Sequence, residues 1–315
     1  MTTGQFVLQI VGITEAELLS RPSTKYPGVG GLSDIKILKD NREMVAHTPS
    51  YDCDGLAEAG LNILVAPCPP DEDDGEILDA MNGDTFTHTI FLSVFREVNH
   101  NRGKPKPVKY KKNVPGEDDS DSDDEDNEQF IAINPKIAIE VMESAIEKTL
   151  MTALPAVKQF KRNIEIKLAG KVDSTFSFVG FCTDGVPFIM EVNNVPFADY
   201  NHGTRKKAPA GKFRFSEKTS YFPGKSCKNT AEMVKKINDL TTIKKESITR
   251  CLLGYVIART DIDRFELSAY NDEYRAAVRH AVENGVDIVP LVVSWTKEGV
   301  ALFATDELTV VYPAP

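Results

Sequence analysis

The sequence has no long hydrophobic run, few cysteines and no paired cysteine motif. Its apolar stretches are all shorter than the roughly 18–20 residues that a membrane-spanning helix needs. The first residues, MTTGQFVLQIVG, lack the basic start and long apolar stretch of a signal peptide. The five cysteines are scattered without a CxxC pair, which argues against a disulfide framework or a zinc site. These absences predict a cytoplasmic or nuclear protein that is neither secreted nor bound to a membrane.

The charge is divided unevenly along the chain. The formal net charge of the 315 residues is −10. Residues 117–128 hold nine acidic residues and no basic ones, so the rest of the chain is almost neutral. Residues 205–250 instead contain thirteen Lys or Arg and only four Asp or Glu. A basic segment of this kind is typical of surfaces that bind phosphates.

The segment 102–129 separates two regions of different composition. Its first half is basic and contains prolines, its second half is acidic, and neither half can bury apolar surface. We therefore predict a disordered insertion or linker. It is either a solvated spacer or a regulatory element, whose carboxylates would cover a basic groove and whose Ser120 and Ser122 would suit acidophilic kinases. The lysines within 104–112 resemble a weak nuclear import signal.

Residues 1–101 contain short β-type runs separated by turn residues. The runs are QFVLQIVG, DIKILKD, NREMVAHT, NILVAPC and THTIFLSVF. Short strands at close spacing predict a small barrel or sandwich.

Residues 130–315 alternate between helical and strand patterns. Asn134 and Pro135 suit the start of a helix whose apolar stripe includes Val141, Met142, Ala145 and Ile146. The runs KVDSTFSFVGF and VPFIMEVNNV flank CTDG, which indicates a hairpin. TAEMVKKINDL predicts a helix, RCLLGYVIART a strand buried on both faces, NDEYRAAVRHAVENG a helix and DIVPLVVSW a last strand. The alternation predicts an α/β region with a mixed sheet.

The stretch FIMEVNNV places Glu191 on an apolar strand and Asn193 on the same face. Metal-dependent phosphodiester cleavage needs carboxylate ligands for Mg²⁺ or Mn²⁺ and a cation beside them. Asp173 and Glu191, on the two strands of the hairpin, are the candidate metal ligands. A two-residue Asp184-Gly185 turn would put them on opposite faces, whereas a three-residue loop would put them on one face. Without further support, an ordinary sheet is the better explanation, because this pattern arises by chance in many sheets.

The order of the segments adds that support. HTPSYDCDGLAEAGLNILVAP, FIAINPKIAIEVM, KVDSTFSF, FIMEVNNV, YFPGKSCKNTAEMVKKINDL, LLGYVIART and NDEYRAAVRHAVENGVDIV together resemble, in this order, the sugar fermentation stimulation protein family. The resemblance covers most of the chain outside the charged linker. It implies an α+β or α/β chain, with an OB-fold-like small β-barrel that binds nucleic acid followed by a nuclease domain of the PD-(D/E)XK (restriction-endonuclease-like) class with a mixed sheet.

The resemblance also assigns individual positions. Asp173 matches the aspartate of the family's Arg-Ile-Asp strand, and Glu191 matches the glutamate of its Glu-Val-Lys strand. Thr230, Lys235 and Leu240 match the helix that the family writes Thr-Glu-Arg-Gly-x-Lys-His-Leu. His47 and Pro49 match its His-Cys-Pro-Asn segment in the barrel.

Several family positions differ in this chain. Asn193 replaces the lysine of Glu-Val-Lys, Gly224 replaces an aspartate, and the helix residues Asn-Arg and Glu fall at Ile139-Glu140 and Ser144. A neutral Asn193 cannot offset developing negative charge, and losing one such preorganised group costs on the order of 10²–10³ in rate. Lys235 is the candidate replacement for the lysine, and Glu143 or Glu147 for the helix carboxylate. Each of these is also explained by a solvated helix face.

The basic segment supplies candidate nucleic-acid contacts. It interleaves Lys and Arg with Phe213, Phe215, Tyr221 and Phe222, a mixture suited to phosphates and unstacked bases. The alternative is a solvated loop with a few core aromatics. The residues predicted to contact nucleic acid are His47, Lys206, Lys207, Lys212, Arg214, Lys225, Lys228 and Thr230.

The sequence thus predicts three regions: an OB-fold-like barrel (1–101), a disordered linker (102–129) and a PD-(D/E)XK nuclease-like domain (130–315). If the protein is a nuclease, Asp173 and Glu191 bind Mg²⁺ or Mn²⁺, and Asn193 and Lys235 complete the catalytic set. If it is not, it binds DNA or RNA without cleavage and needs no cofactor. The third alternative is a non-enzymatic interaction scaffold regulated by its acidic tract. A homodimer, and a basic protein bound to that tract, are further candidate assemblies.

Overall fold

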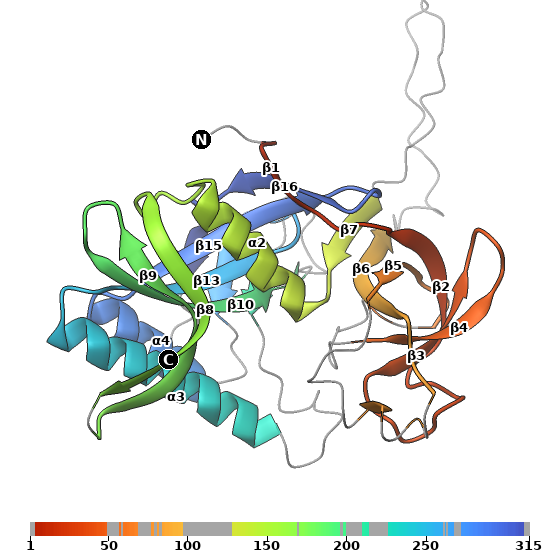
Figure 1. The fold of residues 1–315 in the computed structure, drawn as a ribbon, viewed down its shortest axis with the longest axis horizontal. Helices are drawn as coiled ribbons and strands as arrows, with labels where there is room; N and C mark the ends of the chain where they lie inside the picture. The colour runs from red at the N-terminus through yellow and green to blue at the C-terminus, as the bar shows by residue number, and fades with distance from the viewer. Residues whose placement is uncertain are drawn as a thin grey trace, which may run out of the picture.

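The computed structural model describes residues 4–48, 57, 59–68, 77–78, 81, 84–96, 128–168, 170–195, 198–199, 210–213, 226–260, 262, 264–267 and 272–311. Within these ranges the chain forms a six-stranded sheet, a seven-stranded sheet and a small four-stranded sheet. Figure 1 shows the first of these on the right and the seven-stranded sheet with its helices on the left.

The six-stranded sheet closes into a barrel. It consists of β2 (Thr14–Ser20), β3 (Leu32–Ile37), β4 (Glu43–His47), β5 (Asn62–Pro67), β6 (His88–Arg96) and β7 (Glu128–Ala132), in the order β4-β3-β2-β5-β6-β7. A parallel pairing of His47 with Thr89 joins β4 to β6, so that five strands form a closed ring. Leu18, Ile35 and Ile63 fill its interior. The predicted OB-fold-like barrel is confirmed.

Two strands depart from the predicted domain ranges. β7 follows the charged segment, yet it pairs antiparallel with β6, with Arg96 opposite Glu128. The charged residues therefore connect two neighbouring strands of the barrel, whereas the sequence predicted a linker between domains at 102–129. In addition, β1 (Phe6–Gln9) pairs with β16 of the seven-stranded sheet and does not belong to the barrel.

The seven-stranded sheet is mixed, as predicted. Its order is β1-β16-β15-β13-β10-β9-β8, with β8 (Val157–Leu168), β9 (Val172–Cys182), β10 (Pro187–Val195), β13 (Arg250–Ile257), β15 (Asp287–Trp295) and β16 (Val300–Thr305). The three strands β10, β13 and β15 are parallel to one another. The small sheet contains β11 (Ala198–Asp199), β12 (Ala210–Phe213), β14 (Arg264–Leu267) and β17 (Thr309–Val311). The prediction that DIVPLVVSW is the last strand was wrong, because β16 and β17 follow it.

Helices cover both faces of the seven-stranded sheet. On one face lies α2 (Pro135–Glu147), whose first turn is capped by Asn134 and whose predicted stripe is buried. It lies so close to β13 that a Cβ added to Gly254 would come within 2.7 Å of Met142 Cε. The other face is covered by α3 (Ser226–Glu246) and α4 (Asp272–Glu283), which bury Ile237, Leu240 and Val278 against the sheet.

One hydrophobic core joins the barrel to the sheet. Leu64 and Leu92 of the barrel belong to the same buried cluster as Val7 of β1, Met190 of β10 and Trp295 of β15. The two sheets are therefore packed against each other through apolar side chains. No helix in the described part of the chain is long and apolar enough to cross a membrane.

Candidate functional site

The hairpin that carries Glu191 has the three-residue loop that the metal-site prediction required. Pro187 is opposite Phe181, Phe188 is opposite Gly180, and Cys182 N donates a hydrogen bond to Val186 O. Thr183, Asp184 and Gly185 form the loop, and Gly185 adopts a φ of 82°, which suits glycine. In a regular hairpin this register would place Asp173 and Glu191 on one face.

The hairpin is not regular, because β9 leaves the ladder at Ser177. The pairing between β9 and β10 ends at Phe178 and Met190. Beyond it, Ser177 Oγ accepts a hydrogen bond from Val192 N at 3.1 Å, so a side chain takes the place of a backbone partner. Phe176 packs in the core under α3 and α4, whereas Phe178 packs in the core under α2. Residues two apart on a regular strand share a face. Phe176 and Phe178 do not, so the side chains of β9 switch faces of the sheet at this point.

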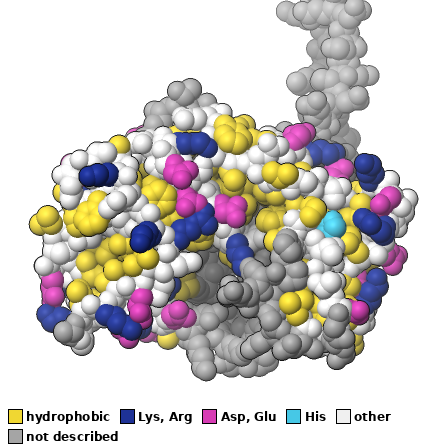
Figure 2. All heavy atoms as spheres, in the orientation of Figure 1, with side chains coloured by type: hydrophobic (Ala, Val, Ile, Leu, Met, Phe, Trp, Pro, Cys, Tyr) yellow, Lys and Arg dark blue, Asp and Glu magenta, His cyan; other side chains and the backbone are white. Residues whose placement is uncertain are grey.

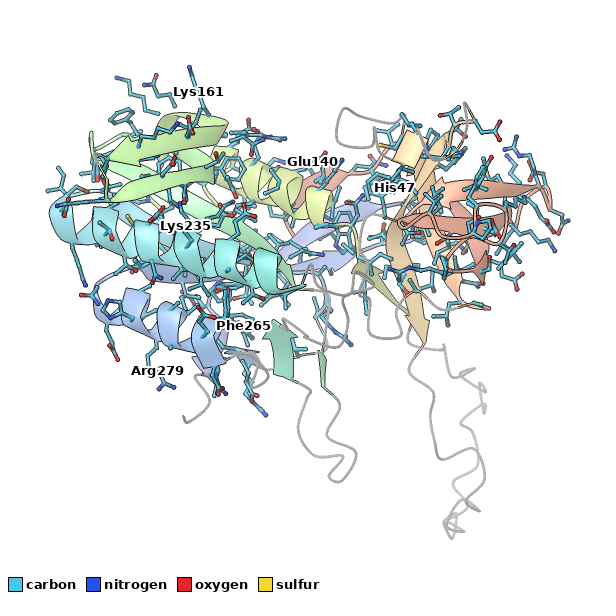
Figure 3. All side chains as sticks on the ribbon, turned by 90° about the horizontal axis from the view of Figure 1, so that it is seen from below. His47, Glu140, Lys161, Lys235, Phe265 and Arg279 are labelled. Atoms are coloured by element: carbon cyan, nitrogen blue, oxygen red, sulfur yellow. The ribbon has the colours of Figure 1, made fainter. Side chains whose placement is uncertain are left out.

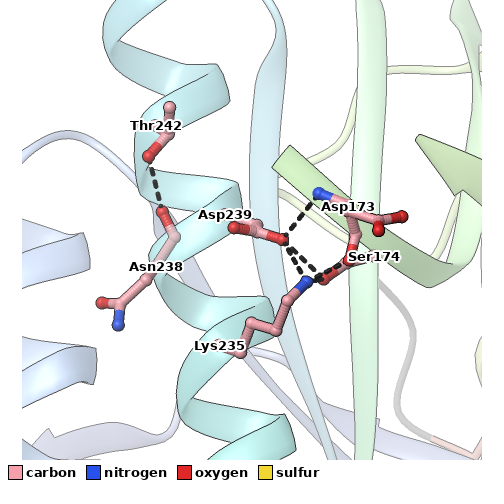
Figure 4. Close-up of polar contacts among 6 residues, drawn as sticks. All are labelled: Asp173, Ser174, Lys235, Asn238, Asp239 and Thr242. Atoms are coloured by element: carbon pink, nitrogen blue, oxygen red, sulfur yellow. Dashed lines mark hydrogen bonds and ion pairs between the residues drawn. The ribbon is translucent and has the colours of Figure 1, made fainter. Parts of the chain in front are cut away.

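This irregularity separates the two predicted metal ligands. Asp173 is exposed and lies opposite Lys167 of the outer strand β8. Figure 4 shows its carboxylate directed away from Lys235 and Asp239 of α3. Glu191 instead faces α3, as its contacts below show. The structure does not bring the carboxylates of Asp173 and Glu191 together.

Glu191 is held by three donors. Its Oε2 accepts hydrogen bonds from Ser177 N at 3.1 Å and from Ser177 Oγ at 3.0 Å. Its Oε1 lies 2.8 Å from Lys236 Nζ. The side chains of Lys236 and Glu191 are only 21% and 13% exposed, so the ion pair is largely screened from water. The cation beside Glu191 is therefore Lys236 and not the predicted Lys235.

Lys235 belongs to a neighbouring cluster that fixes α3 to the start of β9 (Figure 4). Lys235 Nζ lies 3.0 Å from Asp239 Oδ2 and 2.9 Å from Ser174 Oγ, and it also donates to the backbone oxygen of Asp173. Asp239 Oδ2 accepts further hydrogen bonds from Ser174 Oγ at 2.6 Å and from Asp173 N at 3.2 Å. These contacts position the helix on the sheet.

Asn193 lies in a buried polar layer beside Glu191. It is 7% exposed and stands opposite Tyr255 of β13. The hydroxyls of Tyr255 and Tyr274 are 2.6 Å apart in the interior. Burial, the neighbouring Tyr255 and the charge of Glu191 together raise the pKa of Tyr274 well above its usual value. The phenol therefore stays neutral beside the carboxylate.

The carboxylates of α2 lie on the other side of the sheet from Glu191. Glu143 forms an ion pair with Arg162 of β8. Burial raises the pKa of Glu140, and the nearby Arg162 opposes that rise. Figure 3 shows Glu140 on α2, well apart from Lys235 on α3. The partners of Glu191 described above are Ser177 and Lys236. They do not include Glu140, Glu143 or Glu147.

The predicted nucleic-acid contacts are only partly described. Gly224, Lys206, Lys207, Arg214 and Lys225 lie outside the described residues, as does Pro49.

Of the remaining contacts, Lys212 belongs to β12, Lys228 to the first turn of α3, and Thr230 is half-buried on α3. His47 is buried at the barrel closure, where its ring packs on Phe86 with centroids 5.0 Å apart (Figure 3). Its described ring contact is one of packing, and its contact with nucleic acid stays a prediction.

Sequence reasoning missed Ser177, Lys236 and Asp239. A signal for Lys236 exists in the helix pattern. Met233, Ile237 and Leu240 face the sheet. Lys236 follows Met233 by three residues and precedes Leu240 by four, so it lies on the same side of the helix. No comparable signal marks Ser177, because its role depends on where β9 and β10 part.

The described residues do not fit a metal centre of the predicted kind. They contain no group of three or more His, Cys, Asp or Glu that could hold a metal ion. Both oxygens of Glu191 already have donors, and Asp173 faces elsewhere. This geometry gives no place where two carboxylates would share a divalent cation.

Comparisons with known proteins support the resemblance. The family described as "Sugar fermentation stimulation protein RE domain" matches residues 213–299, which include α3, β13, α4 and β15. A solved structure titled "The structure of Pyrococcus Furiosus SfsA in complex with Ca2+" is similar, with a TM-score of 0.63 and 14% identity over 98% of this chain and 99% of that chain. No curated protein matches the sequence. The chain thus resembles this family and shares its fold.

Proposed function

We propose that this protein binds nucleic acid through a nuclease-like fold whose two-carboxylate metal centre has been replaced by an internal ion pair. The observation that carries the proposal is the 2.8 Å contact between Glu191 Oε1 and Lys236 Nζ. It stands where the family resemblance leads us to expect a divalent cation and a strand lysine.

The ion pair explains how Glu191 is accommodated in the interior without a metal ion. A largely buried carboxylate is costly unless a cation and hydrogen-bond donors surround it. Lys236 supplies the cation and Ser177 supplies two donors. A divalent ion bound by Glu191 would have to displace the ammonium group, and it would find no second carboxylate from Asp173.

Two features favour nucleic acid as the partner. The barrel is of the OB-like kind, a fold that commonly binds oligonucleotides. Residues 205–250 carry an excess of nine positive charges, with aromatic residues among them. Such a segment binds phosphates with release of counterions, so the affinity should fall steeply with salt.

A binding experiment tests the partner. Labelled single- and double-stranded DNA and RNA are titrated by fluorescence anisotropy at about 50 and about 200 mM salt, a range over which phosphate contacts weaken strongly. We expect binding at low salt that weakens as salt is raised. The variant K206E/K207E should lose affinity, whereas the matched control K206R/K207R keeps the charges and should bind normally. Absence of any binding at low salt would contradict the proposal and favour an interaction scaffold.

A cleavage experiment tests whether the ion pair of Glu191 and Lys236 has replaced the metal centre. With Mg²⁺ or Mn²⁺ present, we expect no turnover of these nucleic acids above that of the E191Q variant, because the centre lacks convergent carboxylates. Metal-dependent cleavage by the unaltered protein that E191Q abolishes would show that Glu191 serves a catalytic metal.

A further inference from the structure

A groove lies at the outer edge of the seven-stranded sheet, away from Glu191. Its volume is about 510 Å³, and its walls include Phe160, Lys161 and Ile164 of β8 and Gly180 and Phe181 of β9. Figure 3 shows Lys161 at these outer strands, well apart from Lys235. None of the residues that contact Glu191 or Lys235 lines this groove.

The floor of the groove lies where β8 and β9 pack closely at Gly180. A Cβ added to Gly180 would lie 2.3 Å from Gln159 O and 2.7 Å from Phe160 Cβ. With glycine in place, Phe160 packs edge-on against Phe178, with ring centroids 5.7 Å apart. Phe160 is thereby anchored in the core, and β8 and β9 can lie close together beneath the groove.

Phe181 remains exposed beside this floor. It is 46% exposed, although a phenylalanine normally buries its ring. It stands directly opposite Gln159 on β8. Figure 2 shows hydrophobic side chains next to Lys or Arg on the left of the molecule, where Figure 1 places β8 and β9.

One lysine of β8, Lys161, lines the groove, and a second, Lys158, precedes the lining residue Gln159 on the same strand. Lys158 and Lys161 are exposed, and neither forms an ion pair with a described residue. The neighbouring cations are already neutralised, since Lys167 pairs with Glu165 and Arg162 pairs with Glu143. The groove therefore joins an exposed aromatic ring to the free ammonium group of Lys161, with that of Lys158 on the same strand.

We propose that this groove binds a single-stranded segment of nucleic acid, with one base stacked on Phe181 and the adjoining phosphates near Lys158 and Lys161. Aromatic faces accept unstacked bases of any sequence, and lysines neutralise the backbone. A duplex keeps its bases stacked internally and cannot use Phe181 in this way. The volume lies within the range of about 300–1,000 Å³ typical of small-ligand sites, which suits one nucleotide. The inference rests on the proposed nucleic-acid binding and adds its strand preference.

The test compares F181A with the unaltered full-length protein. We expect F181A to lose about tenfold or more in affinity for single strands, the usual cost of removing one stacking ring, and to bind duplexes normally. F181W should retain the affinity, because it keeps an aromatic face. I248A is the matched control, since Ile248 is another exposed apolar residue, 78% exposed, that does not line the groove. Fluorescence of a 2-aminopurine base in the strand should be quenched by stacking and recover with F181A.

Further variants separate the possible failures. K158E/K161E should weaken single-strand binding and reduce its salt dependence. If F181A and K158E/K161E both bind single strands normally while K206E/K207E does not, the groove is not the site, although the protein still binds nucleic acid. If the unaltered protein binds no nucleic acid, both proposals fail together.

Discussion

Glu191 and Lys236 show how one residue pair determines what a site can do. Ser177 binds one oxygen of the Glu191 carboxylate and Lys236 binds the other. The side chains of Glu191 and Lys236 are both largely buried. Replacing Lys236 by methionine leaves Glu191 without its cation. Removing one partner of a buried pair costs roughly 3–5 kcal/mol, so we expect K236M to lower the free energy of unfolding by about 2–4 kcal/mol in this partly exposed pair. Urea denaturation measures the loss.

Two controls accompany that prediction. K158M removes an exposed lysine without an ion pair and should change the stability by less than about 0.5 kcal/mol. E191Q/K236M removes both charges and should recover much of the loss. If Mn²⁺ raises the melting temperature of K236M and not that of the unaltered protein, a metal ion has taken the ammonium's place. Equal losses for K236M and K158M would show that the pair contributes nothing.

Asp34 is a second residue whose surroundings determine its charge. Its carboxylate accepts hydrogen bonds from Ser20 Oγ at 2.7 Å, Ser23 Oγ at 2.5 Å and Thr24 N at 2.7 Å. Burial raises its pKa, but these hydrogen bonds outweigh the burial and lower the pKa to about 2.

The folded state therefore favours the charged form of Asp34, and the unfolded chain takes up the proton first. This contribution is full above about pH 4 and is lost as the pH falls towards 2, by about 2 kcal/mol. Urea denaturation at pH 5 and pH 2.5 should show a smaller pH dependence for D34N than for the unaltered protein. Since other carboxylates titrate in both proteins, the difference between them isolates Asp34. Parallel pH profiles would contradict the prediction.

At the scale of single residues, the sequence predicts the presence of Glu191 at the site but not its partners. Glu191 is recognisable because a charge interrupts an apolar strand. Its contact with Ser177 depends on the point where two strands separate, and its contact with Lys236 depends on the rotation of α3. Both are properties of the assembled sheet and helix. The same separation explains why Asp173 faces away despite the correct loop length.

At the scale of elements, local signals predicted the helices and the buried strands. α2 starts at a capping asparagine followed by proline, and β13 is an unbroken apolar run. The strands β2 and β8 were not predicted, because charged residues interrupt the apolar pattern of both. β8 is the outer strand and is exposed on both faces, so it has no period of two to recognise. The pairing of β1 with β16 joins distant parts of the chain and leaves no local trace.

Gly180 gives a prediction about how β8 and β9 pack. Because an added Cβ would clash with the backbone of β8, we expect G180A to lower the free energy of unfolding by more than about 2 kcal/mol, as overpacking of a core does. Gly60 is the control, since it has a φ of 89° and open space around its Cβ position. G60A should cost only about 1 kcal/mol of backbone strain. Equal costs for the two would mean that close packing at Gly180 is unimportant.

At the scale of the whole molecule, the chain is interwoven. It starts in the seven-stranded sheet with β1, forms the closed ring of five strands, passes through the charged segment, adds β7 to β6 and returns to the seven-stranded sheet. Leu64, Leu92 and Trp295 belong to one core. Apolar side chains of the barrel are therefore buried against the seven-stranded sheet, and the two sheets stabilise each other.

The position of the acidic tract within this arrangement determines how it can be removed. Arg96 and Glu128 face each other where β6 ends and β7 begins, so the tract leaves and re-enters the barrel at one place. Deleting residues 113–127 removes eight acidic residues and leaves β7 intact. If the tract competes with nucleic acid for basic residues, the deletion should tighten binding several-fold at about 50 mM salt and little at about 200 mM, because screening weakens the competition.

A charge-neutral variant decides whether length or charge is responsible. Changing the same eight residues to Asn and Gln keeps the length of the tract and removes its charge. We expect this variant to bind nucleic acid as tightly as the deletion, since electrostatic mimicry of phosphates depends on carboxylates. If only the deletion tightens binding, the tract obstructs the partner by its bulk. If both variants bind with unchanged affinity at low salt, the tract does not compete with nucleic acid, and its acidity is available for a basic protein partner instead.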